Sequence, residues 1–570
     1  MTTETRREAR RPHIITRVTR RRLLVTGGQA AAGFGAASLL AACGSKKSSP
    51  GQTSTPTATA AGTPKRGGSV TVRIQSDPPN FSVFTASFLT AGFADLAYNK
   101  LLAQKVGPDV TPDQVVLEPD LAAAMPEQPD STTYIFKLRP GVKWQNVPPA
   151  NGAALTAQDV VDAVNAYRTN TASAFRSDYG AIDSVAATDA QTIKIVTKEP
   201  YAPLLAISAG QYGLRVFPVK LLENDAIKKQ AVGTGPFILD SYQQGSRASY
   251  KRNPDYFRSD RPYLDAVTLA IIPQEASAIS AFETGQADII GSIPCVSADE
   301  VKRAKSDAKY GATYDVFPGG YIALNTTKAP FSDARVRRAV SMAFNRKAES
   351  DALECGQGKP DQLIPTGAWK LALRPDQMGD ASKYWAYNPD EAKKLLAEAG
   401  FANGFEVSAV YTPQYGQAYQ DSLARAASDF KAVGITVKPT AVQYNQWISS
   451  LYRPPFKFDG MLWGPSRYYS DPDPYVWYWL HPDPKQGISN QSRVNDPQLV
   501  PLLTKQRQTL DSQQRNAVLE QIEKIVADQQ YYVGRTTGVA YTFWQPWIQG
   551  YGLYLGYDFP QLERIWDARR

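Results

Sequence analysis

The sequence predicts a mixed α/β protein, and three local patterns support this fold class. Large apolar side chains occupy every second position from Tyr134 to Leu138, and the run stops at Pro140-Gly141, which is typical of a β-strand. Residues 156–167 and 388–400 instead have helix caps and an apolar period of 3.6 residues. Strand and helix patterns alternate along the chain without an internal repeat, which indicates that both kinds of element build the body.

Three helices are predicted from their first residues and their apolar faces. Thr156 and Asp159 form a variant of the capping box at the start of the first. The third begins at Asn388-Pro389 and ends at Gly400. The second, over 333–344, has an apolar face made of Val336, Ala339, Val340, Ala343 and Phe344. The arginines beside that face, at 335, 337 and 338, are expected to point to solvent.

The first 42 residues resemble an export signal. All eight arginines of this segment lie at or before Arg22, and the apolar stretch Leu23–Ala42 follows. Within it, TRRRLL (19–24) resembles the twin-arginine export motif, with Arg20 and Arg21 as the paired arginines. The alternative is a transmembrane anchor, for which the stretch has the length; its four glycines disfavour that interpretation.

Residues 40–43, LAAC, resemble a bacterial lipobox, in which the cysteine is lipidated and becomes the new N-terminus. Cys43 is therefore expected to hold the protein on the membrane through a lipid; the alternative is an ordinary buried cysteine. Residues 43–67 are rich in Gly, Ser, Thr, Pro and Lys, a composition that does not bury a core. They are expected to form a flexible tether between membrane and body.

Composition limits the function classes. The chain carries a net charge of +9, but the signal segment contributes eight arginines against two glutamates, so the remainder has 55 basic and 52 acidic side chains. Nucleic-acid binding is therefore not favoured. His481 is the only histidine after residue 42, which leaves little material for a metal site or a catalytic triad, and neither a metal nor a cofactor is expected. Asp471 and Asp473 could serve as the acids of a glycosidase, but each precedes a proline, which favours a turn.

Two cysteines follow Cys43, namely Cys295 and Cys355. In an exported protein they could form one disulfide, but the sequence does not establish that they are close.

Several blocks, in order, resemble the large extracytoplasmic solute-binding proteins of ABC importers, family 5, which includes peptide-, oligopeptide- and nickel-binding members. The blocks are RGGSVTVRIQSDPPNFSVF (66–84), PDLAAAMPEQPDSTTYIFKLRPGVKW (119–144), GAALTAQDVVDAV (152–164), VGTGPFILDSYQQGSRASYKRNPDYF (232–257), YLDAVTLAIIPQEASAISAFETGQADII (263–290), GYIALNTTKAPFSDARVRRAVSMAFNRKA (320–348), YNPDEAKKLLAEAGF (387–401) and DPDPYVWYWL (471–480).

The resemblance implies a two-lobed periplasmic-binding-protein-like fold of type II, the large peptide-binding class, with a subdomain inserted in the N-terminal lobe. Lobe I is expected over 66–98, 232–317 and 531–570, the inserted subdomain over 99–231, and lobe II over 318–530. A solute would bind between the lobes, which close by a hinge motion.

The same resemblance implies that the protein is not an enzyme. It would be a monomeric lipoprotein on the outer face of the cytoplasmic membrane, in the periplasm or cell envelope. There it would capture a peptide or similar small solute and deliver it to ABC permease and ATPase subunits. Three alternatives stay open: an oligosaccharide-binding member of the same fold, an exported glycoside hydrolase, and a signalling receptor or chaperone on the same scaffold.

Residues 444–479 include twelve aromatic side chains, about three times the chain average of 11%. Trp477 and Trp479 are assigned to the core. Trp463 matches a tryptophan that lines the cleft in peptide-binding relatives, so the loop after it is expected to face the ligand. The full ligand-contacting set is Phe81, Phe84, Tyr415, Tyr444, Trp447, Trp463, Ser466, Arg467, Tyr468, Tyr469 and Asp471.

Two departures from the family pattern bear on the ligand. Peptide-binding relatives have an aspartate three residues after the tryptophan, which holds the peptide's ammonium group; this chain has Ser466 there, with Asp471 as a substitute. Dipeptide-binding relatives also have an arginine where this chain has Tyr415. A dipeptide is therefore disfavoured, whereas a longer peptide bound through its backbone remains open.

Overall fold

Strand β1 (Ser69–Ile74) lies in the middle of a seven-stranded sheet, parallel to the strand on each side of it. In this computed structural model, the described part of the chain comprises residues 63–110, 115–317, 320–366, 369, 371–466, 468–553 and 560–570. Arg20, Arg21, Cys43 and Arg467 therefore lie outside the described residues. No helix within the described ranges is both long and apolar enough to cross a membrane.

The first sheet defines lobe I. Val70 and Val72 of β1 are fully buried because helices and loops cover the sheet on its faces. In spatial order its strands are β11 (Lys309–Phe317), β17 (Gly538–Trp544), β10 (Ile289–Pro294), β1, β9 (Ala266–Ile271), β8 (Arg247–Arg252) and β7 (Phe237–Gln243). Its helices are α1 (Phe88–Ala94), α5 (Glu275–Glu283) and α6 (Cys295–Ala304).

The segment between α1 and β7 forms an insert with its own small sheets. The predicted strand at 134–138 is confirmed as β4, and the Thr156–Asp159 capping box is confirmed at the start of α2. The core of the insert is continuous with that of lobe I, so the two are packed as one body. The elements are β2 (Leu102–Gln104), β3 (Leu117–Pro119), β4 (Thr133–Lys137), α2 (Ala157–Thr169), α3 (Arg176–Tyr179), β5 (Ile182–Ala187), β6 (Thr192–Thr197) and α4 (Leu204–Ala209).

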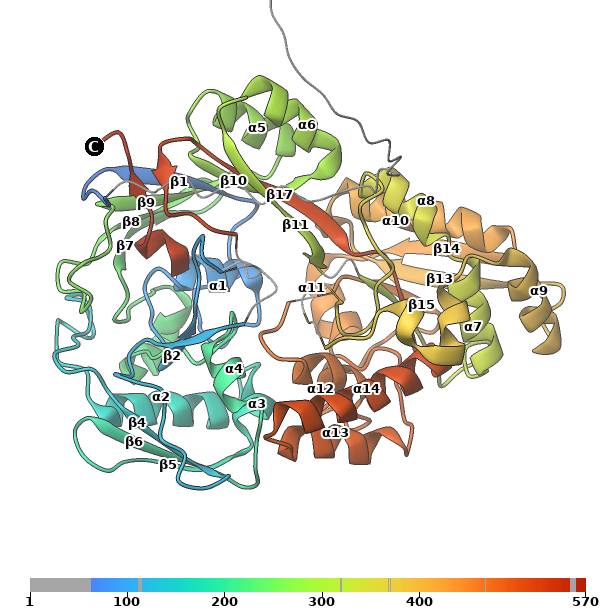
Figure 1. Cartoon of the computed structure of the whole chain (residues 1–570), viewed down its shortest axis with the longest axis horizontal. Helices are drawn as coiled ribbons and strands as arrows, with labels where there is room; N and C mark the ends of the chain where they lie inside the picture. The colour runs from blue at the N-terminus through green and yellow to red at the C-terminus, as the bar shows by residue number, and fades with distance from the viewer. Residues whose placement is uncertain are drawn as a thin grey trace, which may run out of the picture. The chain divides into compact units, whose positions relative to one another are not determined.

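Lobe II is built on a five-stranded sheet with helices on both faces (Figure 1). In spatial order the strands are β14 (Ile435–Ala441), β13 (Phe405–Tyr411), β15 (Met461–Gly464), β12 (Tyr321–Leu324) and β16 (Tyr532–Gly534). The helices are α7 (Ala334–Ala343), α8 (Arg346–Leu353), α9 (Pro389–Glu398), α10 (Gln417–Lys431), α11 (Tyr444–Gln446), α12 (Asp473–Leu480), α13 (Leu499–Gln508) and α14 (Ser512–Gln529). A short antiparallel ribbon, β18 (Ile548–Gln549) with β19 (Trp566–Asp567), lies near the C-terminus.

The chain passes between the two sheets twice, from β11 to β12 and from β16 to β17. The second crossing corrects one expected boundary. The resemblance predicts that the C-terminal segment of lobe I begins at residue 531, but β16 pairs with β12 of lobe II, with Ile322 opposite Val533. The first strand of this segment in the lobe I sheet is therefore β17.

Candidate ligand-binding site

The insert and lobe II meet along a surface formed by α3, α4 and the segment before α4 on one side and by residues 468–508 on the other. Figure 1 shows α12 and α13 beside α3 and α4. The hydroxyl of Ser470 donates to the carbonyl of Ala206 at 2.7 Å, and the Tyr478 hydroxyl donates to the Asp178 carboxylate. The backbone N–H of Ala202 donates to the carbonyl of Arg507 at 2.8 Å. The two bodies are therefore in direct hydrogen-bonded contact.

A small cavity of about 30 Å³ lies within this contact. This is room for about two water molecules, or for one small polar group. Side chains of both bodies line it: Ala86, Ala174, Phe175, Asp178, Ile207, Gln211 and Tyr212 on one side, and Arg453, Tyr469, Ser470, Pro474, Tyr478 and Ile488 on the other. Tyr469 and Ser470 belong to the loop that follows Trp463, so this part of the loop does face the opposite body.

Asp178 is the acidic group of this cavity. Only 5% of the residue is exposed, and burial raises the pKa of Asp178 to about 7. The positive charges of Arg507 and Arg453 act in the opposite direction, while Asp473 adds to the increase. Among the described residues, no basic side chain lies within ion-pair distance of Asp178.

Asp471 does not have the position expected of a ligand anchor. It accepts from both terminal nitrogens of Arg515, at 2.9 and 2.6 Å, and also from the backbone N–H of Asp473. Asp473 is in turn held by Nε and Nη2 of Arg507, each at 2.7 Å. Both carboxylates considered for a glycosidase are thus the acidic halves of buried ion pairs, at and before the start of α12.

Trp463 also differs from the expectation. Its ring is fully buried in the core between the lobe II sheet and α7–α10, with Phe344 edge-on at 6.2 Å and the Arg535 guanidinium 4.6 Å from the ring centre. The alternation of β15 explains this placement, because Leu462 faces the opposite core, which includes α12–α14. Trp463 is therefore a core residue of lobe II, and it precedes the loop that lines the cavity.

Phe81 and Phe84 are likewise core residues. The Phe81 ring packs edge-on against Phe93 and Tyr242, and the Phe84 ring packs edge-on against Tyr167 and Phe217. Both are about 3% exposed. Both rings are therefore buried within the core of lobe I in this structure.

The remaining predicted residues fall into two groups. Tyr415, Tyr444 and Trp447 form an aromatic cluster in lobe II, with the Tyr415 ring centre 6.0 Å from Tyr444 and 6.2 Å from Trp447. Trp447 is buried, whereas the two tyrosines are partly exposed. Tyr468 lies at the contact between the bodies, where its hydroxyl accepts from Nε2 of Gln104 at 3.1 Å. Ser466 is partly exposed in the same loop.

The insert contributes Asp178, Gln211 and Tyr212, which sequence reasoning missed. Asp178 stands in a short helix, and Gln211 and Tyr212 stand in the turn after α4, so no local pattern marks them as ligand contacts. Only the packing of the insert against lobe II brings them to the cavity.

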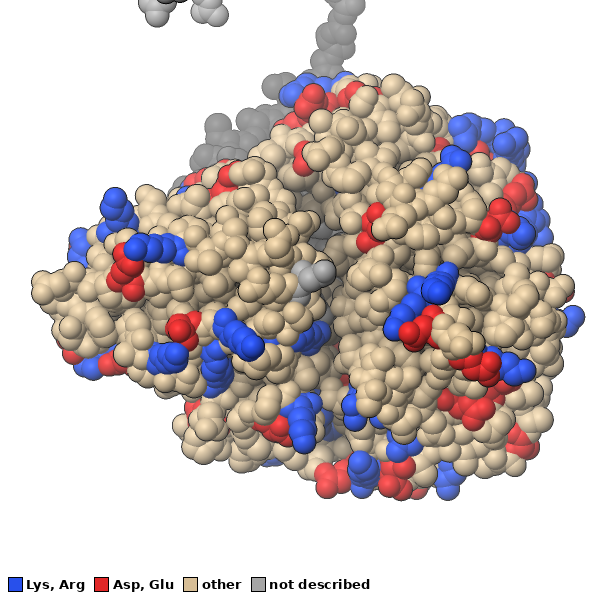
Figure 2. Space-filling view, turned by 180° about the vertical axis from the view of Figure 1, so that it is seen from behind, with Lys and Arg blue, Asp and Glu red and all other residues tan. Residues whose placement is uncertain are grey.

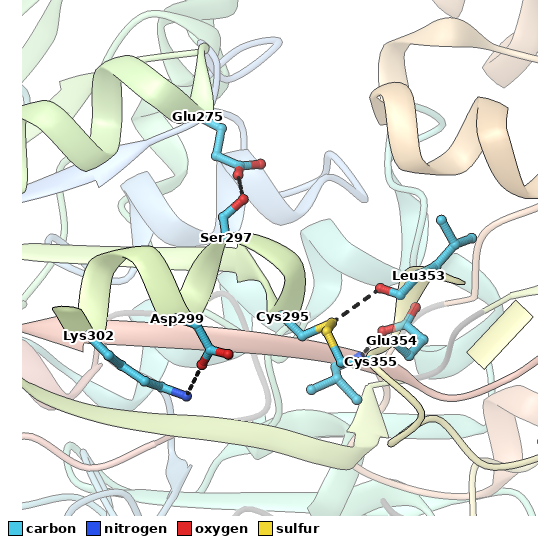
Figure 3. The surroundings of a disulfide bond; sticks show 9 residues. Glu275, Cys295, Ser297, Asp299, Lys302, Leu353, Glu354 and Cys355 are labelled. Carbon is cyan, nitrogen blue, oxygen red and sulfur yellow. Dashed lines mark hydrogen bonds and ion pairs between the residues drawn. A yellow bond between two sulfur atoms is a disulfide. The ribbon is translucent and has the colours of Figure 1, made fainter. Parts of the chain in front are cut away.

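Near the crossings between the lobes, Cys295 and Cys355 form a disulfide with a Cα–Cα distance of 6.1 Å (Figure 3). Cys295 is the first residue of α6 in lobe I, and Cys355 follows α8 in lobe II. Beside it, the carboxylate of Glu354 accepts from the backbone N–H of Val539 in β17 at 2.6 Å, and burial raises the pKa of Glu354 to about 7. The two lobes are therefore tied covalently next to their crossing strands.

The face shown in Figure 2 has lysine, arginine, aspartate and glutamate side chains interspersed over it. This mixture agrees with the nearly balanced charge of the chain after residue 42.

Comparison with known proteins identifies relatives over most of the chain. Residues 116–487 match the family model described as bacterial extracellular solute-binding proteins, family 5 Middle. The chain is 25% identical to heme-binding protein A of Haemophilus influenzae, over 80% of this chain and 84% of the relative. It is 26% identical to the dipeptide-binding protein of Escherichia coli strain K12, over 76% of this chain and 82% of the relative.

Solved structures share the fold. The oligopeptide-binding protein AppA from Bacillus subtilis, in complex with a nonapeptide, superposes with a TM-score of 0.76 at 22% identity, covering 89% of this chain and all of that one. The binding protein MoaA from A. tumefaciens R10, in complex with mannopinic acid, gives a TM-score of 0.72 at 25% identity, covering 88% of this chain and 99% of the other. The two-lobed α/β fold is thus that of the large peptide-binding class. The protein belongs to the bacterial extracellular solute-binding proteins of family 5.

Proposed function

We propose that this solute-binding protein captures a peptide between its lobes and delivers it to the permease and ATPase subunits of an ABC importer. The observation that carries the proposal is the cavity between the insert and lobe II, where polar side chains of both bodies converge on one small space. A solute group bound there would contact both bodies at once and so favour the closed form.

The names of the relatives support a peptide in particular. The dipeptide-binding protein, the glutathione-binding protein GsiB of Escherichia coli and the nonapeptide complex of AppA all point to peptide-like solutes. Mannopinic acid or a similar small solute is the second candidate, because the MoaA structure holds mannopinic acid.

The proposal places the body outside the cytoplasmic membrane, held by a lipid on Cys43 after export through the twin-arginine motif at Arg20-Arg21. The lipobox-like sequence and the polar tether after it support this placement. Replacing the thiol by Cys43→Ser is expected to release the exported protein from washed membranes into the soluble fraction, and continued membrane retention would contradict the lipid anchor.

The ligand class can be tested by thermal shift on the purified protein, with native mass spectrometry to count bound solutes. An equimolar library of tetrapeptides is expected to raise the melting temperature. The increase should grow with the ratio of the free peptide concentration to its dissociation constant. A panel of oligosaccharides and mannopinic acid is the comparison. If a member of that panel stabilises the protein and no peptide does, the peptide assignment is wrong while the transport class stands.

A further inference from the structure

The cavity between the insert and lobe II carries an unusual set of polar groups. The Asp178 carboxylate is buried without an ion-pair partner among the described residues, and its one hydrogen bond comes from the Tyr478 hydroxyl. Burying an ionised carboxylate without a cation is costly, and such groups are normally paired. The two other buried aspartates nearby follow that rule, since Asp471 pairs with Arg515 and Asp473 with Arg507.

A second group in the same cavity also lacks a partner. Gln211 is only 2% exposed, and its buried side-chain amide nitrogen donates to no atom of the described residues. A buried donor left without an acceptor is destabilising, because it has lost its hydrogen bonds to water. The cavity therefore contains a carboxylate without a cationic partner and an amide N–H without an acceptor among the described residues.

We propose that Asp178 binds a primary ammonium group of the solute, and that Gln211 donates to a carbonyl oxygen next to that ammonium group. The amino-terminal residue of a peptide carries both groups, an ammonium group and a carbonyl oxygen. This inference rests on the proposed function and specifies which end of the peptide is held.

The size of the cavity agrees with an end group. About 30 Å³ accommodates an ammonium group but not a whole solute, so the rest of the peptide lies outside the cavity. Phe175, Tyr212 and Tyr469 line the same space, with the Phe175 and Tyr212 rings stacked at 6.0 Å. Aromatic faces beside an ammonium group add a favourable cation–π contribution.

The surrounding charges determine how the site responds to pH. Tyr478 and Arg453 face Asp178 across the cavity, and Arg507 paired with Asp473 lies behind it. Arg453 is directed to the carbonyl of Ile488 and the hydroxyl of Ser489, at 3.2 Å each. Because the pKa of Asp178 is about 7, the carboxylate is mostly protonated at pH 5.5 and ionised at pH 7.5. Ammonium binding should therefore strengthen as the pH rises through this range, below the pKa of a free amino terminus at about 8.

The test compares a tetrapeptide library with its N-acetylated counterpart, by competition against a fluorescent library member and by thermal shift. The unmodified library is expected to bind at least about tenfold more tightly, because acetylation removes the charge that Asp178 would pair with. The Asp178→Asn variant keeps the shape and the Tyr478 hydrogen bond, and should abolish both this preference and the rise in affinity between pH 5.5 and 7.5.

Tyr478→Phe is the matched control. It removes the hydrogen bond between Tyr478 and Asp178 but leaves the Asp178 carboxylate. The affinity for both libraries should therefore fall alike, and the preference for a free amino terminus should remain. Equal binding of the two libraries to the unmodified protein would overturn the ammonium assignment while leaving peptide capture intact. Binding of neither library would overturn the proposed function itself, and the assignment with it.

Discussion

Individual charged residues show how the contact surface is kept rigid. Asp473 is completely buried at the start of α12, where two nitrogens of the Arg507 guanidinium donate to its carboxylate. The Arg507 guanidinium also lies 3.5 Å from the centre of the Trp477 ring. This stacking fixes the helix that carries Tyr478, so the position of the Asp178 hydrogen bond depends on a pair that the solute never touches.

Removing the cation from the Arg507–Asp473 pair should strongly lower the stability of the protein. Arg507→Met leaves the Asp473 carboxylate buried without a cation, with the Gln506 amide as a remaining donor, and is expected to lower the free energy of unfolding by about 3–5 kcal/mol. The control is Arg335→Met, which breaks the exposed pair with Asp333 and should cost under about 1 kcal/mol. Urea unfolding followed by circular dichroism measures both; equal losses would show that the buried pair has no special weight.

Sequence reasoning at this scale succeeded where a residue's environment follows from its own helix or strand. Val336, Ala339, Val340, Ala343 and Phe344 are all fully buried, as their spacing predicted. Arg337, expected to face solvent, is instead buried and donates to the carbonyls of Phe331 and Gln529. Its partners come from other parts of the chain, about 190 residues away in the case of Gln529, and a helical pattern does not contain them.

At the scale of elements, the end of α4 is fitted closely to the loop before α12. Gly210 follows α4, and a Cβ atom built on it would lie 1.9 Å from the Ser470 hydroxyl oxygen. The backbone of Gly210 has φ −71°, which any residue adopts, so the glycine is required by the neighbouring loop and not by the turn. A methyl group at this position would therefore force the Ser470 side chain or its loop to shift.

Gly210→Ala is expected to weaken binding of the tetrapeptide library by about 5- to 100-fold, because the added methyl overpacks the closed contact. Gly291→Ala is the control, since its Cβ would meet only Thr542 at an ordinary 3.4 Å. Adding Ser470→Gly to Gly210→Ala removes the clashing Ser470 atoms but also the Ser470–Ala206 hydrogen bond, so it should restore part of the affinity. Isothermal titration measures all three, and unchanged affinity of Gly210→Ala would mean that this contact is not part of the bound form.

The elements themselves were easier to predict than their faces. The helix beginning at Asn388-Pro389 and the strand β4 were correctly predicted, because caps and alternation are local signals. Which face of β15 would meet a ligand was not predictable, since this strand is buried on both sides and Trp463 and Leu462 are equally apolar. The resemblance to relatives predicts a ligand contact for the Trp463 ring, which the structure places in the core; in the loop after it, Tyr469 and Ser470 line the cavity.

At the scale of the whole molecule, two bodies are joined by two strand crossings and one disulfide. The segment after the disulfide pairs with the second crossing, where the backbone N–H of Thr537 donates to the Lys359 carbonyl at 2.8 Å and that of Asp361 to the Arg535 carbonyl at 2.8 Å. The bond from Cys295 to Cys355 therefore lies next to hydrogen-bonded segments of the second crossing. It adds a covalent connection between the lobes beside the two peptide connections.

The disulfide closes a loop with a sequence separation of 60 residues. The chain-entropy model gives about 4 kcal/mol of stabilisation for such a loop. The double variant Cys295→Ser, Cys355→Ser is expected to lose about this much in urea unfolding, while its affinity for the tetrapeptide library changes less than twofold. Wild-type protein treated with dithiothreitol should match the variant; a loss of affinity instead of stability would assign the bond a role in closure.

The same bond also has a consequence for cleavage. Residues 296–354 contain the first crossing between the lobes, so a protease that cuts there severs one of the two peptide connections. The resulting fragments would still migrate together on a gel run without thiol and would part only after reduction. A nicked receptor in an oxidising envelope would thus remain one particle, with both halves of its binding surface still facing each other.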